Sequence, residues 1–124
     1  MAKVKEMQLP EPQPLGAVLL NALELPWDRA IYRRSNSDWT LETPCYILDP
    51  ELYEDTPDGR AFAAKEGIRF VFGTHQVHEI VDNLQLQVGE PSLDQLFQGF
   101  LYYLENDAFM NFGGWDDGSA TFIT

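Results

Sequence analysis

Two consecutive segments in the second half of the chain repeat apolar residues at helical spacing, and they constrain the fold more than any other feature. The first begins at Thr74, which we interpret as an N-cap, and its stripe consists of Val77, Ile80, Val81, Leu84 and Val88. The second follows the capping-box pattern Ser92-Leu-Asp-Gln, and its stripe consists of Leu93, Leu96, Phe97, Phe100, Leu101 and Leu104. A helix with one apolar stripe must bury that stripe against another element. The sequence therefore predicts helices over 74–87 and 92–105 that share a core.

Short runs of β-favouring residues precede and follow these helices. The clearest is Ile68-Arg-Phe-Val-Phe-Gly, which is rich in β-branched and aromatic side chains. Residues 30–34 and 45–48 are further strand candidates, the second with Pro44 tolerated at its start. A fourth is the terminal Ala120-Thr-Phe-Ile-Thr. We expect these four runs to form the strands of one sheet.

Prolines and glycines mark the remaining boundaries. Residues 1–14 end in a proline-rich lead-in that favours an extended chain, and a first helix is predicted over 15–25 before Pro26. Residues 49–58 carry acids and prolines without a base, which predicts an exposed loop, and 61–67 predicts a short helical turn closed by its glycine. Without a regular βαβ alternation, the order indicates an α+β fold. We expect one domain over 15–124, with a largely antiparallel sheet of about four strands flanked by three main helices.

Charge narrows the choice of partner. The 124 residues contain 20 acids and 8 Lys or Arg, for a formal net charge of −12, and no Lys or Arg follows Arg69. Such a surface repels nucleic acid phosphates and anionic membranes and attracts a basic protein through a long-range field. We therefore expect a basic protein partner and no binding to nucleic acid or membranes. The absence of a signal-peptide pattern and of a membrane-length apolar run predicts a cytoplasmic protein.

The residues that could carry chemistry form no recognisable catalytic motif. Cys45 is the single cysteine, and its apolar setting favours a buried structural thiol over a nucleophile. His75 and His78 could share a helical face with Glu79 or Asp82, but a metal site generally needs three or four converging ligands. Surface histidines are the favoured interpretation. We predict no enzyme activity, no metal and no cofactor.

Acids grouped with aromatic residues are the candidates for partner binding, because exposed tyrosine and tryptophan are frequent in protein interfaces. The sequence places two such groups in turn-rich segments. The predicted partner-binding residues are Glu51, Tyr53, Glu54 and Asp55 in the first group and Asp107, Asp116 and Asp117 in the second.

Two segments carry a resemblance to known proteins. Trp39-Thr-Leu-Glu-Thr-Pro-Cys-Tyr-Ile-Leu-Asp-Pro with the following Tyr53-Glu-Asp, and Phe97 through Leu101-Tyr-Tyr-Leu-Glu-Asn-Asp-Ala-Phe, resemble a family of small acidic bacterial proteins of unknown function. The resemblance covers about residues 30–112. That family has no assigned catalytic residues, so it implies no site.

The chain is also similar in type to the immunity proteins that neutralise polymorphic and contact-dependent bacterial toxins. This likeness implies a non-enzymatic protein that blocks the active site of a basic toxin, for example a nuclease. Two alternatives stay open: a small metal-dependent enzyme that uses His75, His78 and nearby carboxylates, and a structural or regulatory module whose acidity only supports solubility. The oligomeric state is not determined by the sequence.

Overall fold

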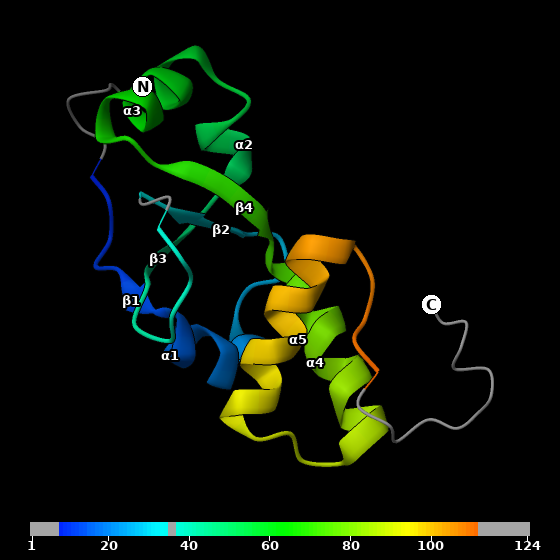
Figure 1. Cartoon of the computed structure of the whole chain (residues 1–124). Helices are drawn as coiled ribbons and strands as arrows, with labels where there is room; N and C mark the ends of the chain where they lie inside the picture. Colours follow the sequence, from blue (N-terminus) through cyan, green and yellow to red (C-terminus); the bar gives the residue numbers. More distant parts are fainter. Residues whose placement is uncertain (1–7, 35–36, 112–124) are drawn as a thin grey trace.

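A four-stranded antiparallel sheet lies at the centre of the molecule. The computed structural model describes residues 8–34 and 37–111. The strands β1 (Gln13–Pro14), β2 (Ala30–Arg33), β3 (Pro44–Leu48) and β4 (Arg69–Gly73) are arranged in the order β1-β3-β2-β4 (Figure 1). The predicted α+β class is confirmed. The fourth strand is β1, however, in a segment that we predicted to be a lead-in without strand structure, whereas 120–124 lies outside the described residues.

Helices cover both faces of this sheet. Successive residues of β2 point to opposite faces, so Ile31 belongs to one apolar core and Tyr32 to another. One face is covered by α1 (Leu15–Leu20), α4 (Thr74–Val88) and α5 (Leu93–Asn106), and we call these helices, with the segment from Asn21 to Arg29, the large helical layer. The shorter α2 (Pro50–Tyr53) and α3 (Pro57–Glu66) cover the other face (Figure 1).

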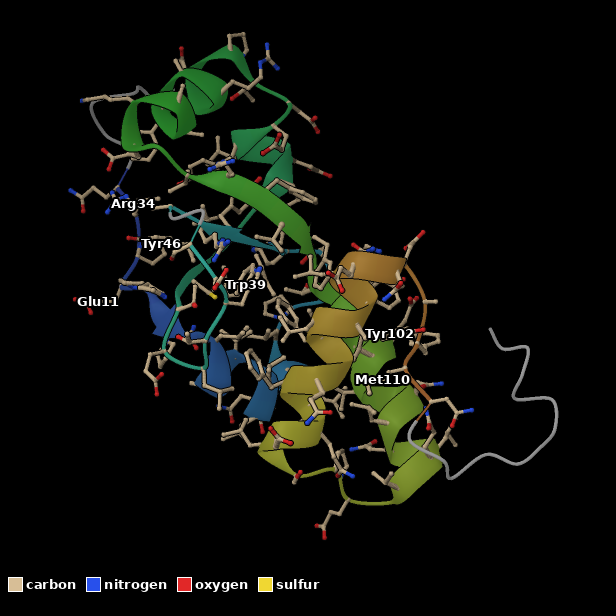
Figure 2. All side chains as sticks on the ribbon, in the orientation of Figure 1. Glu11, Arg34, Trp39, Tyr46, Tyr102 and Met110 are labelled. Atoms are coloured by element: carbon tan, nitrogen blue, oxygen red, sulfur yellow. The ribbon has the colours of Figure 1, made fainter. Side chains whose placement is uncertain are left out.

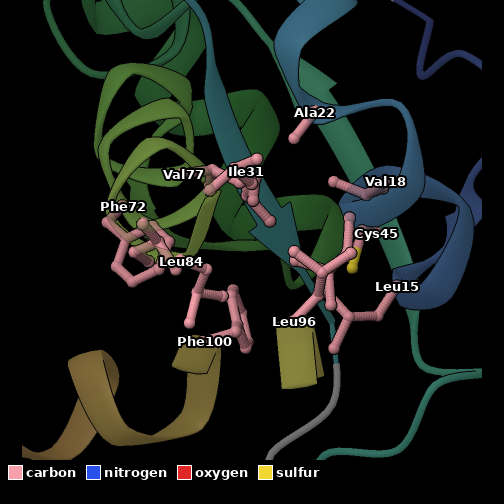
Figure 3. Packing of buried hydrophobic residues seen from close by; sticks show 13 residues of the cluster. Leu15, Val18, Ala22, Ile31, Cys45, Phe72, Val77, Leu84, Leu96 and Phe100 are labelled. Atoms are coloured by element: carbon pink, nitrogen blue, oxygen red, sulfur yellow. The ribbon is translucent and has the colours of Figure 1, made fainter. Parts of the chain in front are cut away.

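The larger core lies between the sheet and the large helical layer (Figure 3). The predicted stripes of α4 and α5 supply much of it, and Phe100 at its centre has no exposed surface. The ring of Phe100 packs edge-on against Trp39 at 5.1 Å and Phe72 at 5.3 Å between centroids. The helix predicted at 92–105 also begins as expected, because Ser92 and Gln95 form a reciprocal capping box. Both long helices are therefore confirmed.

The first helix is shorter than the predicted 15–25. It ends at Leu20, and a 3-10 turn, η2 (Ala22–Glu24), follows. The change of helix type alters the angle between successive side chains. As a result Leu23, which helical spacing over the predicted 15–25 would place on one stripe with Leu15, Val18, Leu19 and Ala22, is 47% exposed.

The segment predicted as an acidic loop, 49–58, instead contains the starts of two helices. Asp49 caps α2 by accepting a hydrogen bond from a backbone N–H at 3.0 Å, and Thr56 caps α3 in the same way at 2.9 Å. A proline follows each cap at the first helical position, where its missing N–H costs nothing. The prolines therefore begin helices here, whereas we interpreted them as loop residues.

Two glycines shape this pair of helices. Gly67 ends α3 at φ 71°, as the predicted glycine-closed turn required. Gly59 packs directly on the backbone of α2, where a Cβ atom would lie 1.7 Å from the carbonyl oxygen of Leu52. Only glycine fits at this contact.

Thr74 has a different role from the predicted N-cap. Gly73 is the N-cap residue of α4, and the Gln76 side chain accepts a hydrogen bond from its N–H at 2.9 Å. The fully buried Thr74 hydroxyl instead accepts from the Arg29 N–H at 3.2 Å and lies 2.5 Å from the Pro26 carbonyl oxygen, to which it donates. It therefore fixes the segment that leads into β2.

Replacing this hydroxyl tests its contribution to folding. We expect Thr74→Val to lower the free energy of unfolding by about 0.5–1.5 kcal/mol, because the part-buried Arg29 N–H and Pro26 carbonyl each lose one hydrogen bond. Thr74→Ser keeps the hydroxyl and is the matched control. Urea unfolding followed by circular dichroism measures both, and equal stabilities of the two variants would contradict this role.

Cys45 is a buried structural thiol, as predicted. Its side chain has no exposed surface, and the sulfur donates to the Thr43 carbonyl oxygen at 3.4 Å. Burial raises the pKa of Cys45 from its ordinary value of 9.0 to about 12. The thiol therefore stays protonated in the folded protein at neutral pH, and it is a poor nucleophile because the thiolate is the reactive form.

The raised pKa has a consequence for stability. Above about pH 9 the unfolded chain releases the thiol proton while the folded chain keeps it, so this contribution to stability falls as pH rises, by up to about 1.4 kcal/mol per pH unit. We expect the stability difference between the wild type and Cys45→Ala to narrow from pH 8.5 to 10.5, measured by urea unfolding. A constant difference would show that the folded thiol ionises normally.

Candidate protein-binding surface

The acidic side chains of the molecule are exposed and mostly without cationic partners. Among the described residues every Asp and Glu except Asp49 and Glu66 is exposed. In the same part of the chain two ion pairs form: Arg29 with Asp28 at 3.0 Å, and Arg34 with Glu66 at 2.6 Å. The negative charge is therefore largely uncompensated at the surface.

This charge is most one-signed on the large helical layer. Its two long helices carry Glu79, Asp82, Asp94 and Glu105 and no Lys or Arg. The acids of α2 and α3, by contrast, share their face with Arg60 and Lys65. The large helical layer therefore has the stronger field for attracting a basic partner.

The first predicted partner-binding group is only partly available at the surface. Glu51 and Asp55 are exposed, but Tyr53 is 6% exposed, and its ring packs against Tyr32 and Phe62 with both centroid distances 6.0 Å. Our prediction of an exposed tyrosine was therefore wrong, because this segment is helical and turns the ring into the smaller core. Burial, with the negative charge of Asp49, raises the pKa of Tyr53.

Glu54 has a structural contact that the sequence did not indicate. It is exposed, yet its carboxylate accepts a hydrogen bond of 2.8 Å from the Tyr32 hydroxyl at the end of the smaller core. Burial, strengthened by this hydrogen bond, raises the pKa of Tyr32. A substitution of Glu54 therefore removes this hydrogen bond as well as a surface charge.

The second predicted group does not join the first on one helical face. Asp107 is exposed and ends α5 in the left-handed conformation at φ 54°, so it belongs to the large helical layer. Glu51 and Asp55 lie with α2 on the opposite face of the sheet (Figure 1). Asp116 and Asp117 lie outside the described residues.

Exposed apolar side chains gather on the large helical layer. Apart from Phe70 on β4, every large hydrophobic residue that is exposed in the described chain belongs to this layer or to the segment that follows α5. They are Leu20, Leu23, Trp27, Leu86, Tyr102 and Phe109. Leu20 is 61% exposed and Trp27 is 67% exposed, so the N-terminal part of the layer presents large apolar groups to solvent.

A groove of about 290 Å³ lies beside Leu20 and Leu23, and we call it the η2–α4 groove. Its lining consists of Leu19, Leu20, Asn21, Ala22, Leu23, Glu24, Val81, Gln85, Glu90, Pro91 and Leu96. Glu24 and Glu90 are exposed acids, and the lining contains no base. The volume lies just below the ~300–1,000 Å³ typical of small-molecule sites. A groove of this size accommodates side chains of a partner.

Two larger hollows contain arginines that protein groups already engage. In one, of about 490 Å³, Arg34 pairs with Glu66 and its guanidinium lies 5.6 Å from the centre of the Tyr46 ring (Figure 2). In the other, of about 530 Å³, the guanidinium of Arg33 lies 3.9 Å from the centre of the Trp39 ring. Burial lowers the pKa of Arg33, which nevertheless remains charged in proteins. These cation–π contacts give both arginines a role in packing.

The two histidines differ in their surroundings. His75 is exposed, and its ring meets Trp27 edge-on at 5.7 Å between centroids. His78 is half-buried, and its Nε2 atom is buried without a hydrogen-bond partner. Within residues 8–34 and 37–111, no group of three or more His, Cys, Asp or Glu side chains is placed to hold a metal ion. His75 and His78 therefore have no assembled ligand set around them among the described residues.

The contact between Glu54 and Tyr32 can be separated from surface charge by mutation. We expect Glu54→Ala to lower the free energy of unfolding by about 1–2 kcal/mol, because the Tyr32 hydroxyl loses its acceptor. Asp55→Ala removes the same charge from an exposed neighbour and should change it by less than about 0.5 kcal/mol. Thermal or urea unfolding measures both stability changes, and equal changes would contradict a structural role of Glu54.

None of the helices in the described part of the chain combines the length and apolar content required to span a bilayer.

The comparisons with known proteins identify one family. No curated protein and no solved structure matches the chain. A family model described as a domain of unknown function (DUF7716) matches residues 12–112, which include both long helices and all four described strands. This agrees with the predicted resemblance to a family of unknown function. The chain therefore belongs to the DUF7716 family.

Proposed function

We propose that this protein is a non-enzymatic binding protein that neutralises a basic partner, as an immunity protein neutralises its toxin. The observation that carries the proposal is the uncompensated negative charge of the large helical layer, where α4 and α5 display acids without a single Lys or Arg. Folding alone does not require such a one-signed surface, because like charges repel and reduce stability. A positively charged partner relieves this repulsion on binding.

A nuclease toxin is the kind of partner that fits this surface. A nuclease must present positive charge to bind phosphates, and an acidic protein that covers the same site blocks access of the nucleic acid. Electrostatic attraction over the Debye length, about 8–10 Å at physiological salt, accelerates and orients the encounter. Fast association is valuable for an inhibitor that must act before its target does.

The exposure of the predicted partner-binding residues changes which of them support this proposal. Tyr53 is buried and Glu54 supports the fold, so the group on α2 contributes Glu51 and Asp55 as exposed acids. The large helical layer contributes exposed apolar groups as well as acids, and among them Trp27 and Tyr102 are of the residue types enriched at the energetic centre of protein interfaces. We therefore place the main contact on this layer.

The first test is capture of a partner by the tagged full-length protein at low and high salt. We expect one basic protein that high salt releases, that is toxic when produced alone, and whose toxicity this protein suppresses. No partner at low salt, or a captured partner whose toxicity is unaffected, would overturn the proposal.

Charge reversal then locates the contact. We expect Glu79→Lys with Asp82→Lys to lower the association rate constant with the captured partner by about ten-fold at low salt and to flatten its salt dependence. Glu51→Lys with Asp55→Lys reverses the same number of charges on the other face and is the matched control, with a smaller expected effect. Stopped-flow measurements from 20 to 300 mM salt compare the two, and the reverse order would place the contact on α2.

A further inference from the structure

We infer that the η2–α4 groove is the docking site for a basic amphipathic helix of the protein partner. The inference rests on the proposed function and specifies where and how the partner binds. It begins from Leu20 and Leu23, which stand beside the groove with 61% and 47% of their surface exposed. Leu20 is exposed because it lies off the face of α1 that buries Leu15, Val18 and Leu19, and Leu23 is exposed because it lies in the η2 turn that follows.

The interior of the groove is suited to apolar side chains of a partner. Leu19, Val81 and Leu96 line it from three different helices, and all three are buried members of the larger core. A side chain that enters the groove therefore contacts core residues that are already held in place. Little ordering of the protein is required on binding, which favours affinity.

The charges around the groove select a basic occupant. Glu24 of η2 and Glu90 of the turn before α5 both line the groove and are exposed, and neither forms an ion pair within the described chain. Asp82, next to Val81 on α4, is exposed as well. Lysine or arginine residues that flank an apolar anchor would meet these carboxylates, whereas an acidic partner would be repelled.

The backbone of the groove favours a helix over an extended peptide. An added strand gains affinity from main-chain hydrogen bonds to an open sheet edge. The groove is lined by residues of α1, η2, α4, α5 and the turn before α5, and no strand contributes to it. A helix satisfies its own backbone and needs only side-chain contacts, so it is the element that this lining can accept.

Trp27 is a further exposed apolar residue of the large helical layer. It is 67% exposed and lies seven residues after Leu20, and its ring is steadied by the edge contact with His75 on α4. Tryptophan is the residue type most often found at the energetic centre of protein interfaces. Trp27 does not line the groove, but it gives the large helical layer a second exposed apolar group for the same partner.

A synthetic peptide tests the inference on the full-length protein. The probe is a helical Leu/Lys peptide with leucines at positions i, i+3, i+4 and i+7, and the control peptide has the same composition with the leucines spread around the helix. We expect the probe to shift backbone amide signals at residues 20–24, 81, 85 and 90 in nuclear magnetic resonance spectra, and the control to shift them much less.

Variants at exposed positions assign the contact. Leu20→Ser with Leu23→Ser should weaken binding of the probe by at least about ten-fold, whereas Leu86→Ser should change it by less than about two-fold. Leu86 is 77% exposed on α4 but does not line the groove, so it controls for general loss of apolar surface. Unchanged amide dispersion outside the substituted sites verifies that each variant is folded.

The outcomes separate this inference from the proposed function. Shifts centred elsewhere, equal effects of the two sets of variants, or no binding of the probe would each overturn the groove as the docking site. Concentration-dependent shifts of residues 20–24 without peptide would also overturn it, because they would assign the groove to a second copy of this chain. In each case the salt-dependent capture of a basic toxin, measured separately, decides whether the proposed function stands.

Discussion

The burial of β2 on both faces is the constraint on which the rest of the structure depends. Ala30, Ile31 and Tyr32 have no exposed surface, and the strand pairs with β3 on one side and β4 on the other. Ile31 supports the core under the large helical layer, and Tyr32 supports the core under α2 and α3. The neighbouring strand β3 contributes in the same way, with Cys45 in one core and Tyr46 and Leu48 in the other, so these two strands join the two cores. The hydroxyl of Thr74, which holds the segment before β2, matters for the same reason.

The helical layers on the two faces of the sheet differ in the apolar side chains that they leave exposed. The small layer of α2 and α3 buries its aromatic residues and places its one tyrosine–carboxylate hydrogen bond at the edge of its core. The large layer also buries a core but leaves leucines and a tryptophan outside it, among acids. The net charge of −12 disfavours the folded state through self-repulsion, and the apolar burial in both cores must exceed that effect. Surface features that folding does not need are therefore the natural place to look for function.

The sequence predicted the parts of the fold whose signals are local and periodic. The stripes of α4 and α5, the capping box at Ser92 and the strands β2, β3 and β4 are all of this kind. The prediction was wrong where one residue type is compatible with two local structures. Pro50 and Pro57 can interrupt a chain or begin a helix, and only the preceding caps at Asp49 and Thr56 distinguish the two, a signal that was present in the sequence.

The candidate site was harder to predict than the fold, because exposure depends on tertiary contacts. Tyr53 stands among acids in the sequence but packs under a sheet, and Leu23 fits a helical stripe but turns outward after a change of helix type. The charge of the surface could be predicted from composition. The η2–α4 groove could not, because its lining comes from segments about 70 residues apart whose approach depends on the whole large layer.

The irregular pairing of β4 bears on how this protein avoids self-association through its sheet. β4 is the last strand in the described sheet, and strands in that position present unpaired backbone groups that can template aggregation. A register shift opposite Ile31 and Tyr32 disturbs the regular pattern, Arg69 places a charge at the start of the strand, and α4 begins directly after Gly73. These features leave a short, bent and charged edge that a second strand could extend only poorly. The β4 edge therefore offers a poor template for pairing with a strand of a second molecule.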